Sequence, residues 1–179
     1  IDAATFERDL IVNGARRRDA AALLQRARAE RADLEAREAA LRSIVEECVR
    51  RVDPAPRYAV PDTAALGQVP NTRDELETFL RRLDQVSRAM AIAQTAYSKA
   101  LQDHSELDSR LEAYHAKATT KGVAEVADVA QAYQLARGAL DERPSRMLLA
   151  QQLVAVYQTY LQTTPAPRAA HQATSAEEP

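Results

Sequence analysis

The sequence predicts an all-α protein, in which a long antiparallel helical hairpin is followed by two shorter helices. Charged residues make up 28% of the chain and aromatic residues 4%, and the 179 residues include only four glycines. Such a composition is typical of long helices. No segment alternates apolar and polar residues with the period of two that indicates a strand. Two long segments instead space their apolar residues at alternating steps of three and four, the pattern of a coiled-coil seam.

The first long helix is expected to run from the start of the chain to about residue 52. Its apolar stripe consists of Phe6, Leu10, Ala20, Leu24, Ala27, Leu34, Leu41, Val45, Cys48 and Val52. The remaining seam positions are polar and carry Asn13, Arg17, Arg31 and Glu38. The helix must end before Pro54, because the prolines at positions 54, 56, 61 and 70 cannot continue it.

The linker that follows, residues 53–71, reads DPAPRYAVPDTAALGQVPN. It is long for a turn between two packed helices, and long loops in compact domains are often functional. We therefore expect a partner-binding loop at the tip of the hairpin. Its candidate binding residues are Arg57, Tyr58, Val60, Leu66 and Val69.

The second long helix has a clear beginning and end. Thr72 and Glu75 form a capping-box pattern at its start, and Gly122 is suited to a left-handed cap at its end. Between them lies an unbroken seam of Leu76, Phe79, Leu83, Val86, Met90, Ala93, Tyr97, Ala100, His104, Leu107, Leu111, Tyr114 and Ala118.

Two neighbouring helices of similar length with matching stripes are expected to fold back on each other as an antiparallel pair. If Val52 lies opposite Leu76, the register follows. The expected pairs are Cys48 with Phe79 or Leu80, Val45 with Leu83, Glu38 with Met90, Arg31 with Tyr97, and Leu24 with His104.

Two shorter helices are expected after Gly122, separated by a turn around Pro144. The first carries Val123, Val126, Ala130, Tyr133 and Leu140, and the second carries Met147, Leu148, Leu153, Val154, Tyr157, Tyr160 and Leu161. We expect them to pack against residues 3–27 and 100–120. Residues 1–162 would then be one domain, with a four-helix base (3–27 and 100–162) and a two-helix arm (28–99). Residues 163–179 lack periodicity, which predicts a disordered tail.

The segment AYQLARGALDERPSRMLLAQQLVAVY resembles the second helix of a tetratricopeptide repeat joined to the first helix of the next repeat. The matching residues are Ala132, Ala136, Ala139, Leu140, Pro144, Ala150, Leu153 and Tyr157. The resemblance covers about 26 residues, and no second copy occurs at the family's period of about 34 residues. It therefore assigns no family to the chain.

His104 stands where the second seam calls for an apolar residue. A zinc site needs three or four suitable ligands, and the sequence offers His104 no such set. A pH-sensitive core residue is a second interpretation. The interpretation we favour is a polar layer that helps to fix the register of the helices. Cys48, the only cysteine, is a seam residue and is expected in the core.

No phosphate loop, nucleophile elbow, HExxH or CxxC motif occurs. A diiron site in a helical bundle would need paired ExxH motifs, and Glu112 with His115 supplies a single one. The sequence therefore predicts neither an enzyme nor a bound cofactor or metal. Arginines 16–18 and those around the linker are interspersed with acidic residues, which favours a solvated mixed-charge face over nucleic-acid binding.

The function expected from these features is that of a bacterial interaction, scaffold or adaptor module, which binds an unidentified protein partner through its arm and tip. A homo-oligomer formed through the exposed seam fits the same pattern. One alternative is the sensor or signalling segment of a membrane protein whose spans lie outside this chain, and another is an arm that binds nucleic acid. We expect a cytoplasmic location, with an extracytoplasmic one under the sensor alternative, and no membrane contact within the chain itself.

Overall fold

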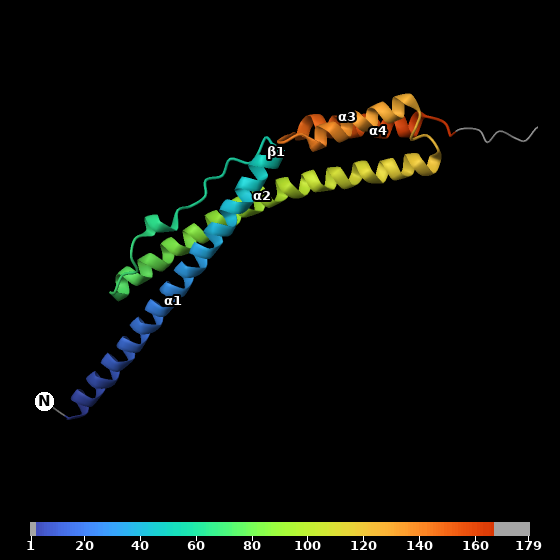
Figure 1. Cartoon of the computed structure of the whole chain (residues 1–179). Coiled ribbons are helices and arrows are strands. Elements are labelled where there is room, and N and C mark those ends of the chain that lie inside the picture. Colours follow the sequence, from blue (N-terminus) through green and yellow to red (C-terminus); the bar gives the residue numbers. More distant parts are fainter. Residues whose placement is uncertain (1–2, 167–179) are drawn as a thin grey trace, which may run out of the picture. The chain divides into compact units, whose positions relative to one another are not determined.

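The computed structural model describes residues 3–166, with side chains from residue 7 onward except those of residues 9 and 10 (Figure 1). The predicted all-α class is confirmed. The described helices are α1 (Ala3–Arg51), α2 (Arg73–Lys121), α3 (Ala127–Asp141) and α4 (Met147–Thr163), with a short 3-10 helix at Thr63–Leu66. Two short strands, β1 (Val52–Asp53) and β2 (Ser145–Arg146), pair in parallel. Most of the tail predicted to be disordered lies outside the described residues.

The chain divides into two compact units, and both long helices contribute to each. Unit 1 contains the residues up to Cys48 together with Pro56–Lys99. Unit 2 contains Val49–Ala55 together with the residues from Ala100 onward. The predicted grouping of residues 3–27 with 100–162 is therefore wrong, because residues 3–27 belong to unit 1.

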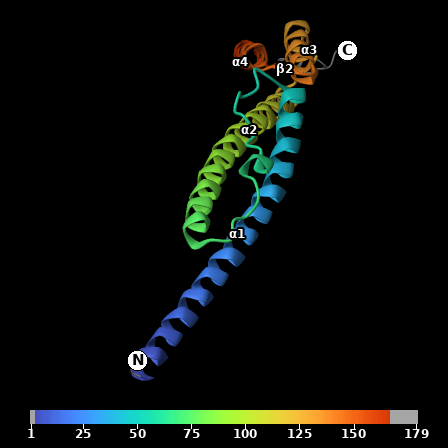
Figure 2. The same ribbon diagram turned by 90° about the vertical axis from the view of Figure 1, so that its left-hand side faces the viewer.

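In unit 1, α1 and α2 run in the same direction, as the colour order along both helices shows (Figure 2). Side chains of both helices meet in parallel register: Nη1 of Arg37 donates to Oγ of Ser87 at 2.8 Å. A cavity is lined by Arg26, Ala29, Glu30, Asp33 and Leu34 of α1 and by Leu80, Leu83, Asp84 and Ser87 of α2. The antiparallel direction predicted for this pair is therefore wrong.

The buried residues follow the same parallel register. Among the described side chains of α1, the buried apolar positions are Ala27, Leu34, Leu41 and Cys48. In α2 a matching series is formed by Leu76, Leu83, Met90 and Tyr97. Both series recur every seven residues, and they differ by a constant 49 positions (76 minus 27, 83 minus 34). The predicted pairs, such as Val45 with Leu83, assumed the opposite direction and do not apply.

Parallel packing requires the linker to return along the helices, and its length permits this. With the 49-residue offset, the start of α2 lies level with about residue 24 of α1, roughly 42 Å back from the end of α1 at 1.5 Å per residue. About 20 extended residues can span roughly 65 Å. The linker, which is too long for a simple hairpin turn, is therefore long enough to run back from the end of α1 to the start of α2.

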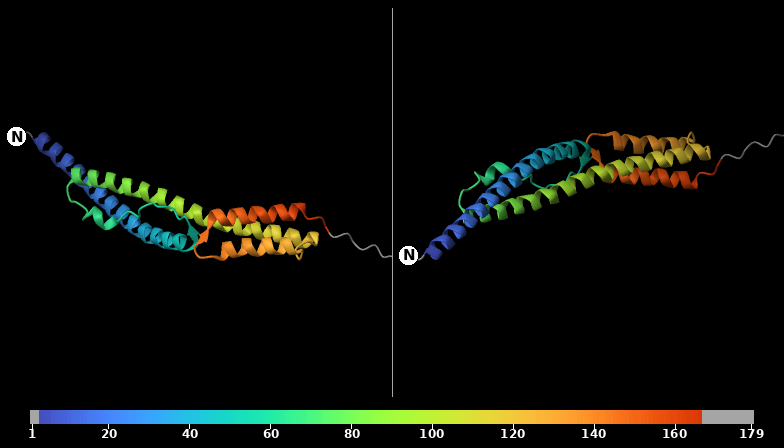
Figure 3. Two further views of the ribbon diagram at one scale, coloured as in Figure 1. Left: turned by 90° about the horizontal axis from the view of Figure 1, so that it is seen from above. Right: turned by 90° about the horizontal axis from the view of Figure 1, so that it is seen from below.

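Unit 2 is built from the C-terminal part of α2, α3 and α4, which run alongside one another (Figure 3). Its core contains Leu107, Leu111, Ala118, Val123, Val129, Ala136, Leu140, Met147, Ala150, Val154, Tyr157 and Leu161. In the described part of unit 2, three helices surround this core, rather than the predicted four. The end of α1 joins it through the β1–β2 pair, where Val52 is the partner of Ser145.

Both ends of α2 lie where the sequence predicts them. Oγ1 of Thr72 donates to Oε2 of Glu75 at 2.6 Å, and the backbone N–H of Leu76 donates to the Thr72 carbonyl at 2.9 Å. At the other end Gly122 has a φ of 76°. The N–H of Gly122 donates to the Thr119 carbonyl and that of Val123 to the Ala118 carbonyl. This pair of bonds is the Schellman ending, which favours glycine because of its positive φ.

Candidate functional site

Residues 56–72, which we call the strap, run back along α1 and α2 of unit 1 (Figures 1 and 2). Glu38 of α1 holds the middle of the strap. Its Oε2 accepts hydrogen bonds from the backbone N–H and the hydroxyl of Thr63, at 2.9 Å and 2.6 Å. Its Oε1 accepts from Nε and Nη2 of Arg42, at 3.0 Å and 2.5 Å. Glu38 and Thr63 are both buried.

Two further contacts fix the strap on either side of Thr63. Nη1 of Arg31 donates to the carbonyl of Gly67. The hydroxyl of Tyr97, on α2, donates to the carbonyl of Tyr58 at 2.9 Å. Arg31 and Glu38 are two of the polar residues that interrupt the apolar stripe of α1, so their role is to bind the strap rather than to face α2.

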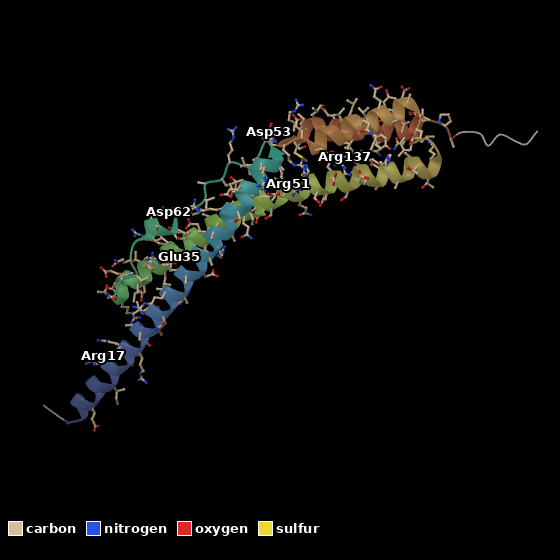
Figure 4. The ribbon with its side chains drawn as sticks, viewed as in Figure 1. Arg17, Glu35, Arg51, Asp53, Asp62 and Arg137 are labelled. Carbon is tan, nitrogen blue, oxygen red and sulfur yellow. The ribbon has the colours of Figure 1, made fainter. Side chains whose placement is uncertain are left out.

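The environment of Glu38 favours its charged form. Hydrogen bonds from the Thr63 side chain, from the Thr63 backbone and from Arg42 lower the pKa of Glu38 to about 2, against the opposing effect of burial. Asp62, labelled in Figure 4, precedes Thr63 and accepts a hydrogen bond from the Ala64 N–H at 2.9 Å. The 3-10 helix of the strap is therefore capped by Asp62 and held to α1 by the buried, ionised carboxylate of Glu38.

The end of the strap and the first turns of α2 line an open pocket of about 420 Å³. The strap supplies Leu66, Gln68 and Pro70, and α2 supplies Asp74, Glu75, Thr78, Phe79 and Arg82. Phe79 is buried beneath it, while Asp74, Glu75 and Arg82 are exposed. The pocket thus has apolar walls and charges of both signs around them.

The structure spreads the five predicted binding residues along the strap instead of gathering them at a tip. Arg57 and Tyr58 are exposed, and Val60, Leu66 and Val69 are half-buried. Of these five, Leu66 lines the pocket. Phe79 and Arg82 also line the pocket but were not predicted as binding residues. The apolar spacing of α2 predicts which side of the helix is buried, but it does not predict where the strap lies.

In unit 2, Arg137 of α3, which is labelled in Figure 4, pairs with three carboxylates. Its Nη1 lies 2.9 Å from Oε1 of Glu112, and its Nη2 contacts Asp108 and lies 3.1 Å from Oδ1 of Asp141. Burial alone would lower the pKa of Arg137, but Asp108, Glu112 and Asp141 together raise it. Because Asp108 and Glu112 belong to α2, this cluster fastens α3 to α2.

An aromatic group lies next to this cluster. The rings of His115 and Tyr133 stack with centroids 4.0 Å apart, and Nδ1 of His115 lies 3.3 Å from the hydroxyl of Tyr157. Burial, followed by Glu112, raises the pKa of Tyr133. Burial also raises the pKa of Tyr157, as do Tyr133 and Glu112. Glu112 and His115, the single ExxH pair, are thus engaged by neighbouring side chains.

His104 is buried, with 5% of its surface exposed. Its Nε2 lies 3.3 Å from the carbonyl of Leu140, at the end of α3. The histidine therefore forms a polar layer between α2 and α3 within unit 2. Leu24, its predicted partner, belongs to unit 1.

Cys48 is fully buried, as predicted, and burial raises the pKa of its thiol. Among the described residues, no group of three or more His, Cys, Asp or Glu side chains is placed to hold a metal ion. No described helix combines the length and apolarity needed to span a membrane.

The chain matches no protein-family model, and neither a curated protein nor a solved structure is similar to it.

Proposed function

We propose that this chain is a non-enzymatic interaction module, of scaffold or adaptor type, that binds a protein partner at the pocket between the strap and α2. The observation that supports the proposal most strongly is the pocket itself. It combines apolar walls from Leu66, Pro70 and Phe79 with the exposed charges of Asp74 and Arg82. Protein interfaces characteristically place an apolar anchor inside a rim of polar groups.

The strap supports the proposal because it presents the pocket in a fixed form. Glu38, Arg31 and Tyr97 each bind a different point of it. A pre-ordered surface loses little conformational entropy on binding, which increases affinity. The parallel, coiled-coil-like α1 and α2 then serve as the rigid support of the pocket. The expected ligand is a protein segment that carries an apolar side chain beside charged groups.

The test places a photo-crosslinking amino acid at Gln68, on the strap side of the pocket. The control carries the same amino acid at Gln94, which is exposed on α2 away from the pocket. In the native cell, crosslinking from Gln68 should yield a discrete protein adduct that is absent from the Gln94 control.

A charge reversal in the pocket then tests whether the pocket itself binds the partner. Arg82→Glu should reduce the adduct about thirtyfold, the loss expected for an interface arginine worth about 2 kcal/mol. Arg88→Glu makes the same change on the same helix outside the pocket, where Arg88 pairs with Asp84 at 2.6 Å, and should leave the adduct intact. Equal adducts from Gln68 and Gln94, or an adduct insensitive to Arg82→Glu, would contradict the proposal.

A further inference from the structure

The first part of α1 has no partner within the described part of the chain. The offset of 49 positions between the buried series places the start of α2 level with residue 24 of α1. The preceding turns of α1 extend beyond α2, and no other described segment lies beside them (Figure 2). They carry exposed apolar side chains, including those of Ile11 (68% exposed) and Val12 (40%). Because helices in proteins gain most of their stability from packing, these turns are expected to pack against another chain.

One face of α1 carries a series of charges that is complementary to its own reverse. Alternating steps of four and three place seven exposed or half-buried residues on this face, which we call the Leu23 stripe: Val12, Arg16, Asp19, Leu23, Arg26, Glu30 and Asp33. Leu23 is the middle position. Counted outward from it, Asp19 on one side corresponds to Arg26 on the other, and Arg16 corresponds to Glu30. Each of these charges therefore has an opposite charge at the same distance from Leu23.

We propose that two copies of this chain associate through the Leu23 stripe, with their α1 helices antiparallel and side by side. The two-fold axis is perpendicular to the plane of the two helices and passes between the two Leu23 residues. Residues at equal distances from Leu23 in opposite directions then lie opposite each other. Arg16 of each copy meets Glu30 of the other, and Asp19 meets Arg26. Within one copy Nε of Arg26 lies 2.6 Å from Oε1 of Glu30, so the contact joins these four charges into one network. The stripe is roughly 32 Å long.

Charge excludes the other ways of pairing the same stripe. In a parallel pair each residue meets its own counterpart, so that Arg16 faces Arg16 and Glu30 faces Glu30. Sliding the antiparallel pair by seven residues brings Asp19 onto Asp19 in one direction, or Arg26 onto Arg26 in the other. Like charges in direct contact are destabilising. A surface that binds a second copy must complement itself, whereas a surface that binds an unrelated partner need not. The stripe therefore favours a second copy.

The cavity between α1 and α2 in unit 1 supplies an apolar part of this interface. Its volume is about 510 Å³, and its lining includes three members of the stripe, Arg26, Glu30 and Asp33. Its apolar lining includes Leu34, Leu80 and Leu83. Val12 of the second copy lies level with Leu34, since both are eleven residues from Leu23, so its exposed side chain can enter the cavity. The unpartnered turns of α1 in each copy thus cover the cavity of the other.

The first test is the mass of the full chain in solution, measured by size-exclusion chromatography with light scattering over a range of concentrations. The parent should be a dimer. Arg16→Glu and Glu30→Arg should each raise the dissociation constant at least about tenfold, because each turns two attractive contacts into repulsive ones. Mixing the two single variants should restore the dimer, since every charge at these positions then faces its opposite again. Arg28→Glu is the matched control. Arg28 is exposed and lies two residues from both Arg26 and Glu30, on the opposite side of the helix, so the dimer should persist.

Three results would overturn the proposal. They are a parent that is monomeric at every concentration, single variants that dimerise as well as the parent, and a mixture that does not restore the dimer.

A disulfide test examines the two-fold geometry directly, in a Cys48→Ser background under a mild oxidant. Leu23→Cys should form a covalent dimer, because a position on the axis meets itself and a disulfide needs Cα atoms within about 7 Å. Gln25→Cys should not, since Gln25 is exposed but lies about 200° further around the helix.

The same chemistry distinguishes antiparallel from parallel helices. Arg16→Cys alone should remain uncrosslinked, and mixing it with Glu30→Cys chains should give a covalent dimer of the two. Failure of Leu23→Cys to crosslink, or crosslinking of Arg16→Cys to itself, would rule out this arrangement. The proposal does not depend on the pocket beside the strap, so the two can fail separately.

Discussion

Replacing Glu38 with alanine is expected to lower the free energy of unfolding by about 3 kcal/mol at neutral pH. The substitution leaves the buried N–H and hydroxyl of Thr63 without their acceptor, and buried donors that lose a charged partner cost this much. Urea unfolding followed by circular dichroism measures the change. Glu30→Ala is the matched control, because Glu30 forms an exposed pair with Arg26 on the same helix and should contribute less than about 1 kcal/mol.

The pH dependence of the free energy of unfolding tests whether the ionised carboxylate of Glu38 causes this stabilisation. The pKa of Glu38 is lowered from 4.5 to about 2 in the folded protein. A group with a lowered pKa stabilises the fold fully above its unfolded value and loses that contribution as pH falls through its folded value. The stability difference between the parent and Glu38→Gln should therefore be constant above pH 4.5 and shrink towards pH 2. A difference that does not change with pH would contradict the assigned role of Glu38.

Replacing Tyr157 with alanine is expected to have the largest effect in unit 2, a loss of about 3–5 kcal/mol. Tyr157 is 0% exposed, its ring centroid lies 5.6 Å from that of Tyr133, and its hydroxyl contacts His115. Alanine would remove the ring and leave a cavity between α2, α3 and α4. Hydrogen exchange measured by mass spectrometry should show faster exchange across α3 and α4.

The conservative variant Tyr157→Phe separates packing from hydrogen bonding. It keeps the ring and removes the contact with His115, which should cost about 1 kcal/mol. If Tyr157→Phe and Tyr157→Ala were equally destabilising, the hydroxyl rather than the ring would be the main contribution, and the packing account of unit 2 would be wrong.

The sequence was sufficient to predict the individual helices. Thr72 and Gly122 mark the two ends of α2, as expected. Gly122 has the positive φ of the predicted cap, whereas the bond found between Thr72 and Glu75 joins their side chains instead of bonding each side chain to a backbone N–H as in a capping box. The seam of α2 predicted its buried residues well, because one stripe of the helix is covered along its length. The stripe of α1 was less well predicted in its first part, where none of the described side chains between residues 7 and 26 is buried.

The direction of the pair could not be read from the same pattern. Apolar residues spaced three and four apart form the same stripe whether the partner helix runs parallel or antiparallel. The polar interruptions of α1 contained the missing information. Arg31 and Glu38 bind the strap, and a linker that lies beside them must run back along the helix. Such contacts join distant parts of the chain, so local spacing does not reveal them.

The candidate site was predicted in part. The proline-rich linker was recognised as more than a turn, and Leu66 lines the pocket that it helps to form. Phe79 and Arg82 were missed because their role depends on where the strap ends. The cluster around Arg137 was missed for a similar reason: Asp108 and Glu112 are 29 and 25 residues away in the chain, and only tertiary packing brings them together.

The most direct test of the fold is a pair of distances measured by electron paramagnetic resonance between spin labels in a Cys48→Ser background. One sample carries labels at positions 28 and 77, in place of Arg28 and Glu77. The other carries them at positions 28 and 98, in place of Arg28 and Ser98. All three positions are exposed and belong to unit 1. In the parallel register, residue 77 lies level with residue 28, and residue 98 lies about 32 Å further along. The 28–77 distance should therefore be clearly the shorter. An antiparallel pair would reverse the order, with 28–98 short and 28–77 long, and would contradict the account of the strap and its pocket.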